Sequence, residues 1–256
     1  MCATCGCGQD EARVTLVDGP EPHEHEHDHA HQHQHQHQHQ QGVLDARTHT
    51  LELEVAVLAR NDATAGRNRA WLAERGITAV NLMSSPGAGK TTLLERTIRD
   101  LGRPVSVIEG DQETVLDAER IRAAGARAVQ VNTGAGCHLD ATMVERALAS
   151  LHPEPGSLLV VENVGNLVCP ALFDLGEDRK VVVISVTEGD DKPLKYPHMF
   201  RVADLVVVNK TDLLPYVDFD PGRLVRDARR VNPDVQVLPV SARTGTNIQD
   251  WYDWLG

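Results

Sequence analysis

From Ile77 onward the sequence alternates between short apolar runs and amphipathic segments. The runs read TAVNLM, PVSVIEG, ARAVQVN, SLLVVEN, KVVVISV, ADLVVVN and VQVLPV. Runs that are apolar on both faces form strands buried on both sides, so this alternation predicts an α/β fold with a mostly parallel sheet between helices. Ligands of such sheets bind beyond the carboxyl ends of the strands, and we expect the functional motifs there.

The segment after the first run carries a phosphate-binding pattern. It reads SSPGAGKTT at residues 84–92 and precedes a helical segment, which matches G-x-x-x-x-G-K-[ST] with Ser84 in the first glycine position. Glycines here let backbone N–H groups wrap the phosphates, the lysine reaches the β- and γ-phosphates, and the hydroxyl binds Mg²⁺. The residues expected to hold the phosphates are Gly87, Ala88, Gly89, Lys90, Thr91 and Thr92.

A second motif, NKTD, follows the run ADLVVV and indicates the base. Asp212 can accept two hydrogen bonds from guanine N1 and N2, a donor pair that adenine lacks. We expect Asn209 to brace the loops and the stem of Lys210 to cover the base. A backbone N–H from Ser241 and Ala242, which follow the run VQVLPV, is expected to contact guanine O6. Together these motifs predict GTP in preference to ATP.

Two acidic residues at strand ends are candidates for Mg²⁺ and for orienting the attacking water. Glu162 ends a strand in a variant of the Walker B pattern, and Asp111 follows SVIEG in the place of a first switch. The alternative is a pair of solvated strand-end acids. We assign catalysis to Lys90, Thr91, Asp111 and Glu162. Because no Gln or Arg is evidently placed to position water, we predict slow intrinsic GTP turnover.

The first residues of the chain contain two groups of metal-binding side chains. Cys2, Cys5 and Cys7 form C-x-x-C-x-C, which one metal ion can gather at little loop-closure cost. Sulfur and nitrogen donors in a square plane suit Ni²⁺, and a tetrahedral arrangement suits Zn²⁺. The alternative is reduced cysteines in a flexible tail. Nine histidines occupy every second position and predict divalent-metal buffering; they are His23, His25, His27, His29, His31, His33, His35, His37 and His39. A purification tag is the competing interpretation, which the interspersed Glu and Gln residues disfavour.

A third group of possible metal ligands follows two of the predicted strands. Cys137 and His138 come after ARAVQVN, and Cys169 comes after the Walker B segment in ENVGNLVCP. Both places are at strand carboxyl ends, so we expect the three side chains to lie near the γ-phosphate. Three ligands leave a metal site open or completed by a second subunit. The alternative is that these are structural cysteines in the core.

Composition separates a tail from a globular domain. The net charge is −12, and the first fifty residues hold eight acidic and two basic side chains, which argues against a nucleic-acid partner. Residues 1–44 lack apolar periodicity and are expected to be a metal-binding tail that is disordered without metal. Residues 45–256 are expected to form the P-loop domain, led by a helix near 50–75 that ends at Gly76. Its predicted apolar face consists of Leu51, Val55, Leu58 and Ala59.

The same patterns bear on location. No apolar stretch approaches the length of a membrane span, and the segment MCATCGCGQD does not look like a secretory signal. We therefore predict a cytoplasmic protein without a membrane partner. In the cytosol, closely spaced cysteines are more often metal ligands or catalytic groups than disulfides.

The combination MCATCGCG, the His-rich insert, SSPGAGKTT, EGD, GCHLD, ENVGNLVCP, GDDKPLKYP and NKTD resembles the hydrogenase nickel-incorporation GTPases of the HypB family. The resemblance implies a SIMIBI-type P-loop NTPase fold and a GTP-dependent homodimer. It implies a GTP-hydrolysing nickel metallochaperone that, with a small zinc-containing partner, delivers nickel to the large subunit of [NiFe]-hydrogenase.

The resemblance also assigns roles to matching residues. Cys2, Cys5 and Cys7 would form a tight nickel site. Cys137, His138 and Cys169 would form a weaker nickel or zinc site. Lys192, which on sequence alone is equally well a surface lysine, would contact the nucleotide across the dimer.

Two other functions compete with this interpretation. A urease-type nickel GTPase shares the P-loop class, but the N-terminal C-x-x-C-x-C motif argues against it. A nickel storage or buffering protein with a vestigial GTPase fold is the second, and the intact Lys90, Thr91 and Asp212 argue against it.

Overall fold

The structure is a computed structural model that describes residues 36–111, 116–134 and 136–256, with only the backbone described for residues 36–54 and 116. The predicted tail ligands Cys2, Cys5 and Cys7 and the side chains of the histidine run lie outside the described residues. The chain divides into two compact units, Met1–Val57 and Leu58–Gly256. The predicted boundary at residue 44 stays a prediction. None of the described helices is both long enough and apolar enough to cross a membrane.

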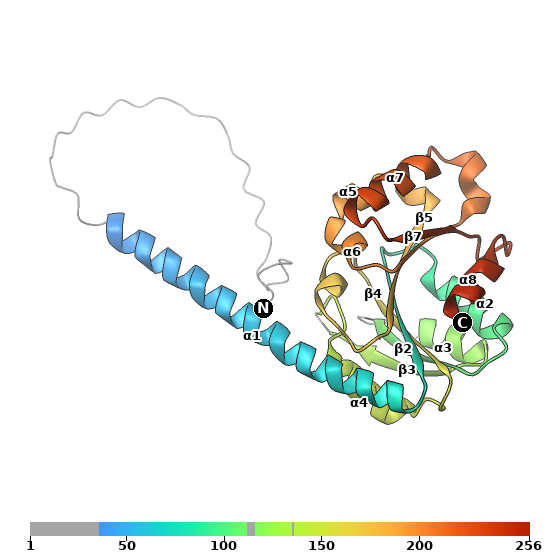
Figure 1. Ribbon diagram of the computed structural model, residues 1–256, viewed down its shortest axis with the longest axis horizontal. Helices are drawn as coiled ribbons and strands as arrows, with labels where there is room; N and C mark the ends of the chain where they lie inside the picture. The colour runs from blue at the N-terminus through green and yellow to red at the C-terminus, as the bar shows by residue number, and fades with distance from the viewer. Residues whose placement is uncertain (1–35, 112–115, 135) are drawn as a thin grey trace. The chain divides into compact units, whose positions relative to one another are not determined.

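The second unit is built on one sheet of seven parallel strands, which confirms the predicted architecture (Figure 1). The strands lie in the order β3-β2-β4-β1-β5-β6-β7, and each coincides with one of the apolar runs. Their bounds are β1 Thr78–Ser84, β2 Val105–Asp111, β3 Arg127–Asn132, β4 Leu158–Gly165, β5 Arg179–Ser185, β6 Leu205–Asn209 and β7 Gln236–Pro239. Because all strands run the same way, their carboxyl ends meet at one edge of the sheet.

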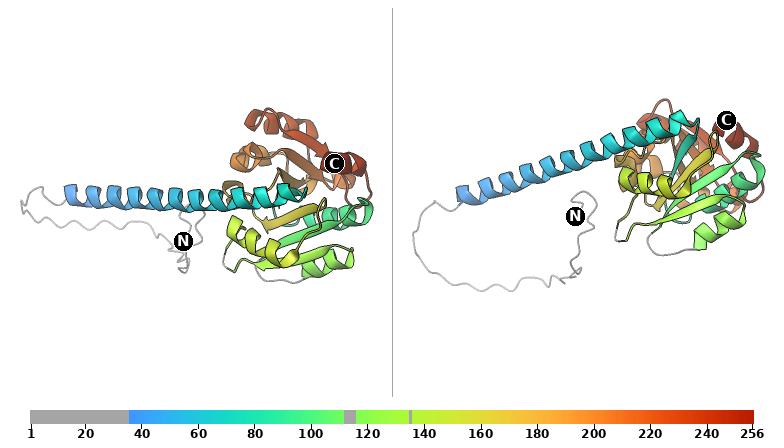
Figure 2. Two further views of the ribbon diagram at one scale, coloured as in Figure 1. Left: turned by 60° about the horizontal axis from the view of Figure 1, so that its bottom comes forward. Right: turned by 90° about the horizontal axis from the view of Figure 1, so that it is seen from below.

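Helices cover both faces of this sheet, as Figures 1 and 2 show. The longer helices are α1 Gln36–Glu74, α2 Lys90–Asp100, α3 Leu116–Ala123, α4 Ala141–Leu151, α7 Pro221–Val231 and α8 Ile248–Leu255. Short turns complete the set: α5 Lys192–Lys195, α6 Pro197–Arg201, η1 Cys169–Leu172, η2 Val186–Glu188 and η3 Thr211–Tyr216. On one face, Leu93 of α2 and Trp251 of α8 pack on β-strand residues such as Leu82. On the other face, the core is made by α1 and α4 at one end and by α6 and α7 at the other.

The helix predicted near residues 50–75 is present as the C-terminal part of α1, but only Leu58 of its predicted apolar face packs on the core, and the side chain of Leu51 lies outside the described residues. Val55 and Ala59 are exposed and Leu58 is only half-buried. Two buried asparagines mark the face that packs instead. Asn68 donates to the carbonyl oxygens of Ala141 and Leu175 over 2.9 and 3.0 Å, and Asn61 donates to the carbonyl oxygen of Asp174 over 2.7 Å. Amides that satisfy buried backbone groups can occupy a core position that periodicity assigns to apolar residues.

The end of α1 agrees with the expectation from the sequence. The helix stops at Glu74, and Gly76 adopts a φ of 62°, a left-handed conformation in which a side chain would be strained. The chain then enters β1, the strand that leads into the phosphate-binding loop.

Candidate functional site

The phosphate-binding loop connects β1 to α2, and a hydrogen bond between side chains at its two ends spans it. Nζ of Lys90 donates to Oγ of Ser84 over 2.8 Å, so the serine in the first glycine position serves as an acceptor for the lysine. Burial lowers the pKa of Lys90, and the nearby Glu162 carboxylate opposes that shift. A phosphate would favour the charged form of this buried ammonium group, which is therefore well placed to bind one.

The loop is held against the NKTD motif, so the two halves of the predicted nucleotide site meet. Nδ2 of Asn209 donates to the carbonyl oxygen of Ala88 over 3.0 Å, and Nζ of Lys210 donates to that of Gly87 over 2.7 Å. Gly89 has a φ of 91°, and a Cβ there would lie 2.6 Å from Nδ2 of Asn209. Only glycine fits this approach, because a side chain would be strained and would also strike the asparagine.

The segment after β7 joins the same cluster through Asn209 and Asp212. The backbone N–H of Ala242 donates to Oδ1 of Asn209 over 3.1 Å, and Oγ of Ser241 donates to Oδ1 of Asp212 over 2.6 Å. The N–H of Ser241 donates to the carbonyl oxygen of Thr246. In this structure both backbone N–H groups have protein acceptors, and the contact with guanine O6 stays a prediction. The hydrogen bond from Ser241 orients the carboxylate of Asp212.

Thr91, Glu162 and Asp111 line one hollow beside the loop, which has a volume of about 560 Å³. Oγ1 of Thr91 donates to Oε1 of Glu162 over 2.8 Å. Among the described residues, Oε2 of Glu162 has no hydrogen-bond donor, although the side chain is buried. A buried carboxylate oxygen without a donor, next to a hydroxyl and a second carboxylate, is a donor set that fits Mg²⁺.

Glu109 is a further buried acid that the sequence did not single out. It pairs with Glu162 in the register between β2 and β4, and it is 2% exposed. Burial, together with the negative charge of Glu162, raises the pKa of Glu109 to about 8. Burial also raises the pKa of Glu162, against the opposing effects of Lys90 and Thr91. Two adjacent buried carboxyls whose pKa values are raised favour a retained proton or a bound cation beside them.

Two residues of α3 also line the 560 Å³ hollow, and sequence analysis missed both. They are Asp117 and Arg120. Nη1 of Arg120 lies 3.0 Å from Oδ1 of Asp117, and Nε donates to Oε1 of Glu95 over 3.0 Å. An arginine therefore borders the phosphate region. Its i, i+3 spacing from an acid was the available signal, but such pairs are common on solvated helices.

The three predicted metal ligands of this unit meet at the carboxyl ends of β3 and β4. The ligand atoms of Cys137, His138 and Cys169 all lie within 4.8 Å of one another. Sγ of Cys137 is 2.9 Å from Sγ of Cys169 and 3.6 Å from Nδ1 of His138. The His138 ring stacks on Phe173 with centroids 4.0 Å apart. Burial lowers the pKa of His138, against the opposing charge of Asp140, and so favours the neutral imidazole that binds metal.

A second hollow, of about 490 Å³, lies between this cluster and the phosphate-binding loop. Its lining includes Ser85, Cys137 and Lys192. Nζ of Lys192 is 3.5 Å from Oε2 of Glu188, whose carboxylate also accepts from Oγ of Ser85. Lys192 is thus tied to the loop of its own chain. Its contact with a nucleotide across a dimer stays a prediction.

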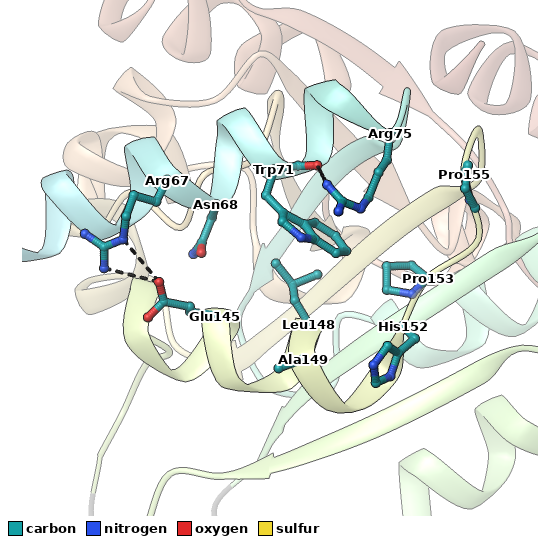
Figure 3. Close-up of a pocket in the computed structure, with 10 residues that line it drawn as sticks. All are labelled: Arg67, Asn68, Trp71, Arg75, Glu145, Leu148, Ala149, His152, Pro153 and Pro155. Carbon is teal, nitrogen blue, oxygen red and sulfur yellow. Dashed lines mark hydrogen bonds and ion pairs between the residues drawn. The ribbon is translucent and has the colours of Figure 1, made fainter.

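A third hollow, of about 580 Å³, lies between α1 and α4 (Figure 3). The guanidinium of Arg75 lies 4.0 Å above the ring of Trp71, and Arg67 pairs with Glu145 over 3.2 Å. The lining contains none of the residues of the nucleotide or metal motifs, and we assign no function to it.

The chain is similar to known proteins over most of its length. Residues 78–239 match the family model described as CobW/HypB/UreG, nucleotide-binding domain. The hydrogenase maturation factor HypB of Rhizobium leguminosarum is 59% identical over 207 residues, which cover 80% of this chain and 69% of the relative. That of Escherichia coli K12 is 55% identical over 207 residues, which cover 80% of this chain and 71% of the relative. A factor of Helicobacter pylori described as a hydrogenase/urease maturation factor HypB is 38% identical over 203 residues, 78% of this chain and 84% of the relative.

Solved structures agree. The crystal structure of HypB from Archaeoglobus fulgidus is 44% identical with a TM-score of 0.72, and covers 77% of this chain and 98% of that chain. The crystal structure of HypB from Helicobacter pylori in complex with nickel is 38% identical with a TM-score of 0.73, and covers 77% of this chain and 93% of that chain.

Proposed function

Since this chain belongs to the CobW/HypB/UreG family and, within it, to the HypB hydrogenase maturation factors, we propose that it is a GTP-hydrolysing nickel metallochaperone. Nickel is its cargo, and GTP hydrolysis times its release to the large subunit of [NiFe]-hydrogenase. A small zinc-containing partner assists this delivery, and the protein works in the cytoplasm as a GTP-dependent homodimer.

The observation that carries the proposal is that the phosphate-binding loop and the end of β4 each border both hollows. Pro86 of the loop and Val164 and Gly165 of β4 line the hollow beside Thr91 and also the hollow beside Cys137. A movement of either segment when the γ-phosphate leaves would alter both sites. The metal ligands and the nucleotide site therefore share a wall, which is the arrangement that gating requires.

The residues have distinct roles in hydrolysis. Lys90 neutralises phosphate charge, and Asp212 selects guanine. Thr91, Asp111 and Glu162 hold Mg²⁺, which when bound neutralises the developing charge on the phosphates. Asp111 or Glu162 orients the attacking water. Turnover is slow, because among the described residues Arg120, the arginine that lines the phosphate hollow, is engaged by Glu95 and Asp117.

The metal ligands are divided between the two parts of the chain. Cys2, Cys5 and Cys7 of the tail at 1–44 form the tight nickel site, and the histidine run buffers divalent metal. Cys137, His138 and Cys169 of the P-loop domain at 45–256 form a weaker site for nickel or zinc. Two thiolates and one neutral imidazole suit either ion, and the site is either left open or completed by a second subunit.

Nickel affinity measured in two nucleotide states tests the proposal. The protein is the full chain with Cys2, Cys5 and Cys7 changed to Ala and the nine histidines of the run changed to Gln, so that nickel reports on the Cys137 cluster. We expect the nickel Kd with a non-hydrolysable GTP analogue and Mg²⁺ to differ from that with GDP by about tenfold, within the usual range of coupling energies. Equal Kd values in the two states would refute gating.

The name of one relative favours a second recipient. The Helicobacter pylori factor is described as serving hydrogenase and urease. Complementation of a hydrogenase-deficient strain and of a urease-deficient strain with this chain separates the two. We expect rescue of hydrogenase, and rescue of urease alone would assign the nickel to the other enzyme.

A further inference from the structure

Two successive residues of β4 connect the nucleotide site to the metal cluster. Successive side chains of a strand point to opposite faces of a sheet. Glu162 therefore faces α2, where its carboxylate accepts from Thr91. Asn163 faces the other side, where it meets the loop that follows His138. Any shift of this strand end displaces both contacts together.

Asn163 is buried, with 1% of its surface exposed, and both polar atoms of its amide form hydrogen bonds. Its Oδ1 accepts from the backbone N–H of Leu139 over 3.2 Å and from that of Val164 over 3.0 Å. Its Nδ2 donates to Oδ1 of Asn81 on β1 over 3.4 Å. Leu139 directly follows His138, so this side chain fixes the backbone that carries two of the three metal ligands.

A second asparagine of the same segment holds the remaining parts of the metal cluster. Nδ2 of Asn166 donates to the carbonyl oxygen of Cys137 over 3.4 Å. Its Oδ1 accepts from the N–H of Val168, the residue before Cys169, over 2.8 Å. Gly165 lies between the two asparagines, and a Cβ there would be 3.3 Å from Pro86 of the phosphate-binding loop. The segment thus touches the loop at Gly165 and the metal cluster on either side of it.

The metal loop has one more close contact, with the end of β2. A Cβ on Gly110 would lie 2.8 Å from Cγ of Leu139, so the side chain of Leu139 sits directly on this glycine. Gly110 precedes Asp111, the acid that lines the phosphate hollow. Leu139 is therefore held at its N–H by the strand of Glu162 and at its side chain by the strand of Asp111.

We infer that Asn163 is a positioning residue that transmits the nucleotide state to the metal cluster. When the γ-phosphate and Mg²⁺ shift Glu162, the hydrogen bond from Leu139 to Asn163 moves the Cys137–His138 backbone relative to Cys169 and changes nickel affinity. The inference rests on the proposed gating of nickel by GTP. It adds the side chain through which that gating acts.

The test compares two buried asparagines in the full chain that carries the tail substitutions described above, Cys2, Cys5 and Cys7 to Ala and the nine histidines of the run to Gln. Asn163→Ala removes the acceptor of Leu139. Asn68→Ala is the matched control, because Asn68 is similarly buried and bonds the carbonyl oxygens of Ala141, close to the same loop, and of Leu175, neither of which belongs to β4. For each variant the nickel Kd is measured with a GTP analogue and with GDP, after GTP binding has been verified.

We expect the parent and Asn68→Ala to share one ratio of Kd values, and Asn163→Ala to bring that ratio to within about twofold of unity. A parent ratio retained in Asn163→Ala would overturn the inference and leave the proposed gating intact. A parent ratio of unity would overturn the gating itself, and the inference with it.

A measurement on the unsubstituted chain covers the case in which Asn163→Ala does not fold. Amide hydrogen exchange of the segment that contains Leu139 is compared between the GTP-analogue and GDP states. We expect the protection of the Leu139 N–H to change with the nucleotide, because its hydrogen bond to Asn163 is the one through which the state is transmitted. Identical exchange at Leu139 in the two states would overturn the inference.

Discussion

The nucleotide site and the metal cluster share one edge of the sheet but are assembled differently. In the nucleotide site, side chains from distant motifs hold the backbone directly, as Asn209 does with the carbonyl oxygen of Ala88. In the metal cluster, the ligands are placed by the backbone of two loops, which are held by Asn163 of β4 and by Asn166 just after it. A site clamped by several motifs is preorganised, whereas a site hung from one strand end follows that strand. The difference fits the proposed function, in which the base site keeps one geometry and the nickel affinity of the metal cluster changes with the nucleotide.

The largest expected effect comes from removing the charge at the phosphates. Lys90→Ala should lower the rate of GTP hydrolysis by roughly 100-fold or more, since a preorganised cation at a developing charge contributes on that scale. Nickel binding to the Cys137 cluster without nucleotide should be unchanged. Phosphate release and nickel titration measure the two effects. Lys195→Ala, an exposed lysine paired with Asp191, is the control. Parallel loss of nickel binding would break the distinction between the two sites.

Removing a metal ligand should have the converse effect. Cys169→Ala, in the chain with the tail cysteines and the histidine run substituted, should weaken nickel binding by about 10- to 100-fold, because it deletes a thiolate donor. GTP turnover measured without nickel should stay within about twofold. His198→Ala changes an exposed residue outside the cluster and should do neither. Unaltered nickel affinity in Cys169→Ala would mean that the clustered sulfurs do not form the site.

The base pocket can be altered without touching either the phosphates or the metal. Asp212→Asn should reduce GTP affinity by about tenfold or more and shift preference toward xanthine nucleotides, because the amide donates where the carboxylate accepted. Competition between GTP and XTP measures the shift. Asp218→Asn, an exposed acid in the following loop, should leave GTP preference unchanged. GTP use that persists in Asp212→Asn would show that another residue selects the base.

The last expected effect concerns stability and the acid beside Glu162, and it is no larger than about tenfold in the folding equilibrium per pH unit. The pKa of Glu109 in the folded protein is about 8, above its ordinary value of 4.5, so the folded state keeps a proton that the unfolded chain releases. Its contribution to stability is complete below that ordinary value and is lost as the pH rises toward 8. The parent should lose up to about 1.4 kcal/mol per pH unit relative to Glu109→Gln in this range.

Urea unfolding of the nucleotide- and metal-free protein between about pH 6 and 8 measures this difference. Glu154→Gln, at an exposed position, should show the parental slope. Equal slopes in the parent and Glu109→Gln would indicate that Glu109 is ionised throughout and has a cationic partner.

The sequence predicted the parts of this fold that depend on local pattern. Each apolar run became a strand, and the motifs at the ends of those runs converged, because parallel strands bring their carboxyl ends to one edge. The face of α1 was mispredicted because Asn61 and Asn68 are buried by tertiary hydrogen bonds that no periodicity reveals. Arg120 was missed because its helical spacing from Asp117 is typical of solvated pairs. Glu109 lies beside Glu162 of a neighbouring strand, and Asn163 bonds Leu139 and Asn81, so both environments depend on residues that are distant in sequence.

The adjacency of Glu162 and Asn163 has a consequence for how such a protein can change over time. Because a strand alternates its side chains, one inserted or deleted residue in β4 would turn the acid toward the nickel side and the amide toward the phosphates. A point substitution can alter Glu162 or Asn163 alone, but an insertion or deletion in the strand changes the orientation of both. The positions of Glu162 and Asn163 are thus coupled through the peptide bond that joins them. A relative that lengthens or shortens this strand must change the nucleotide site and the metal cluster together.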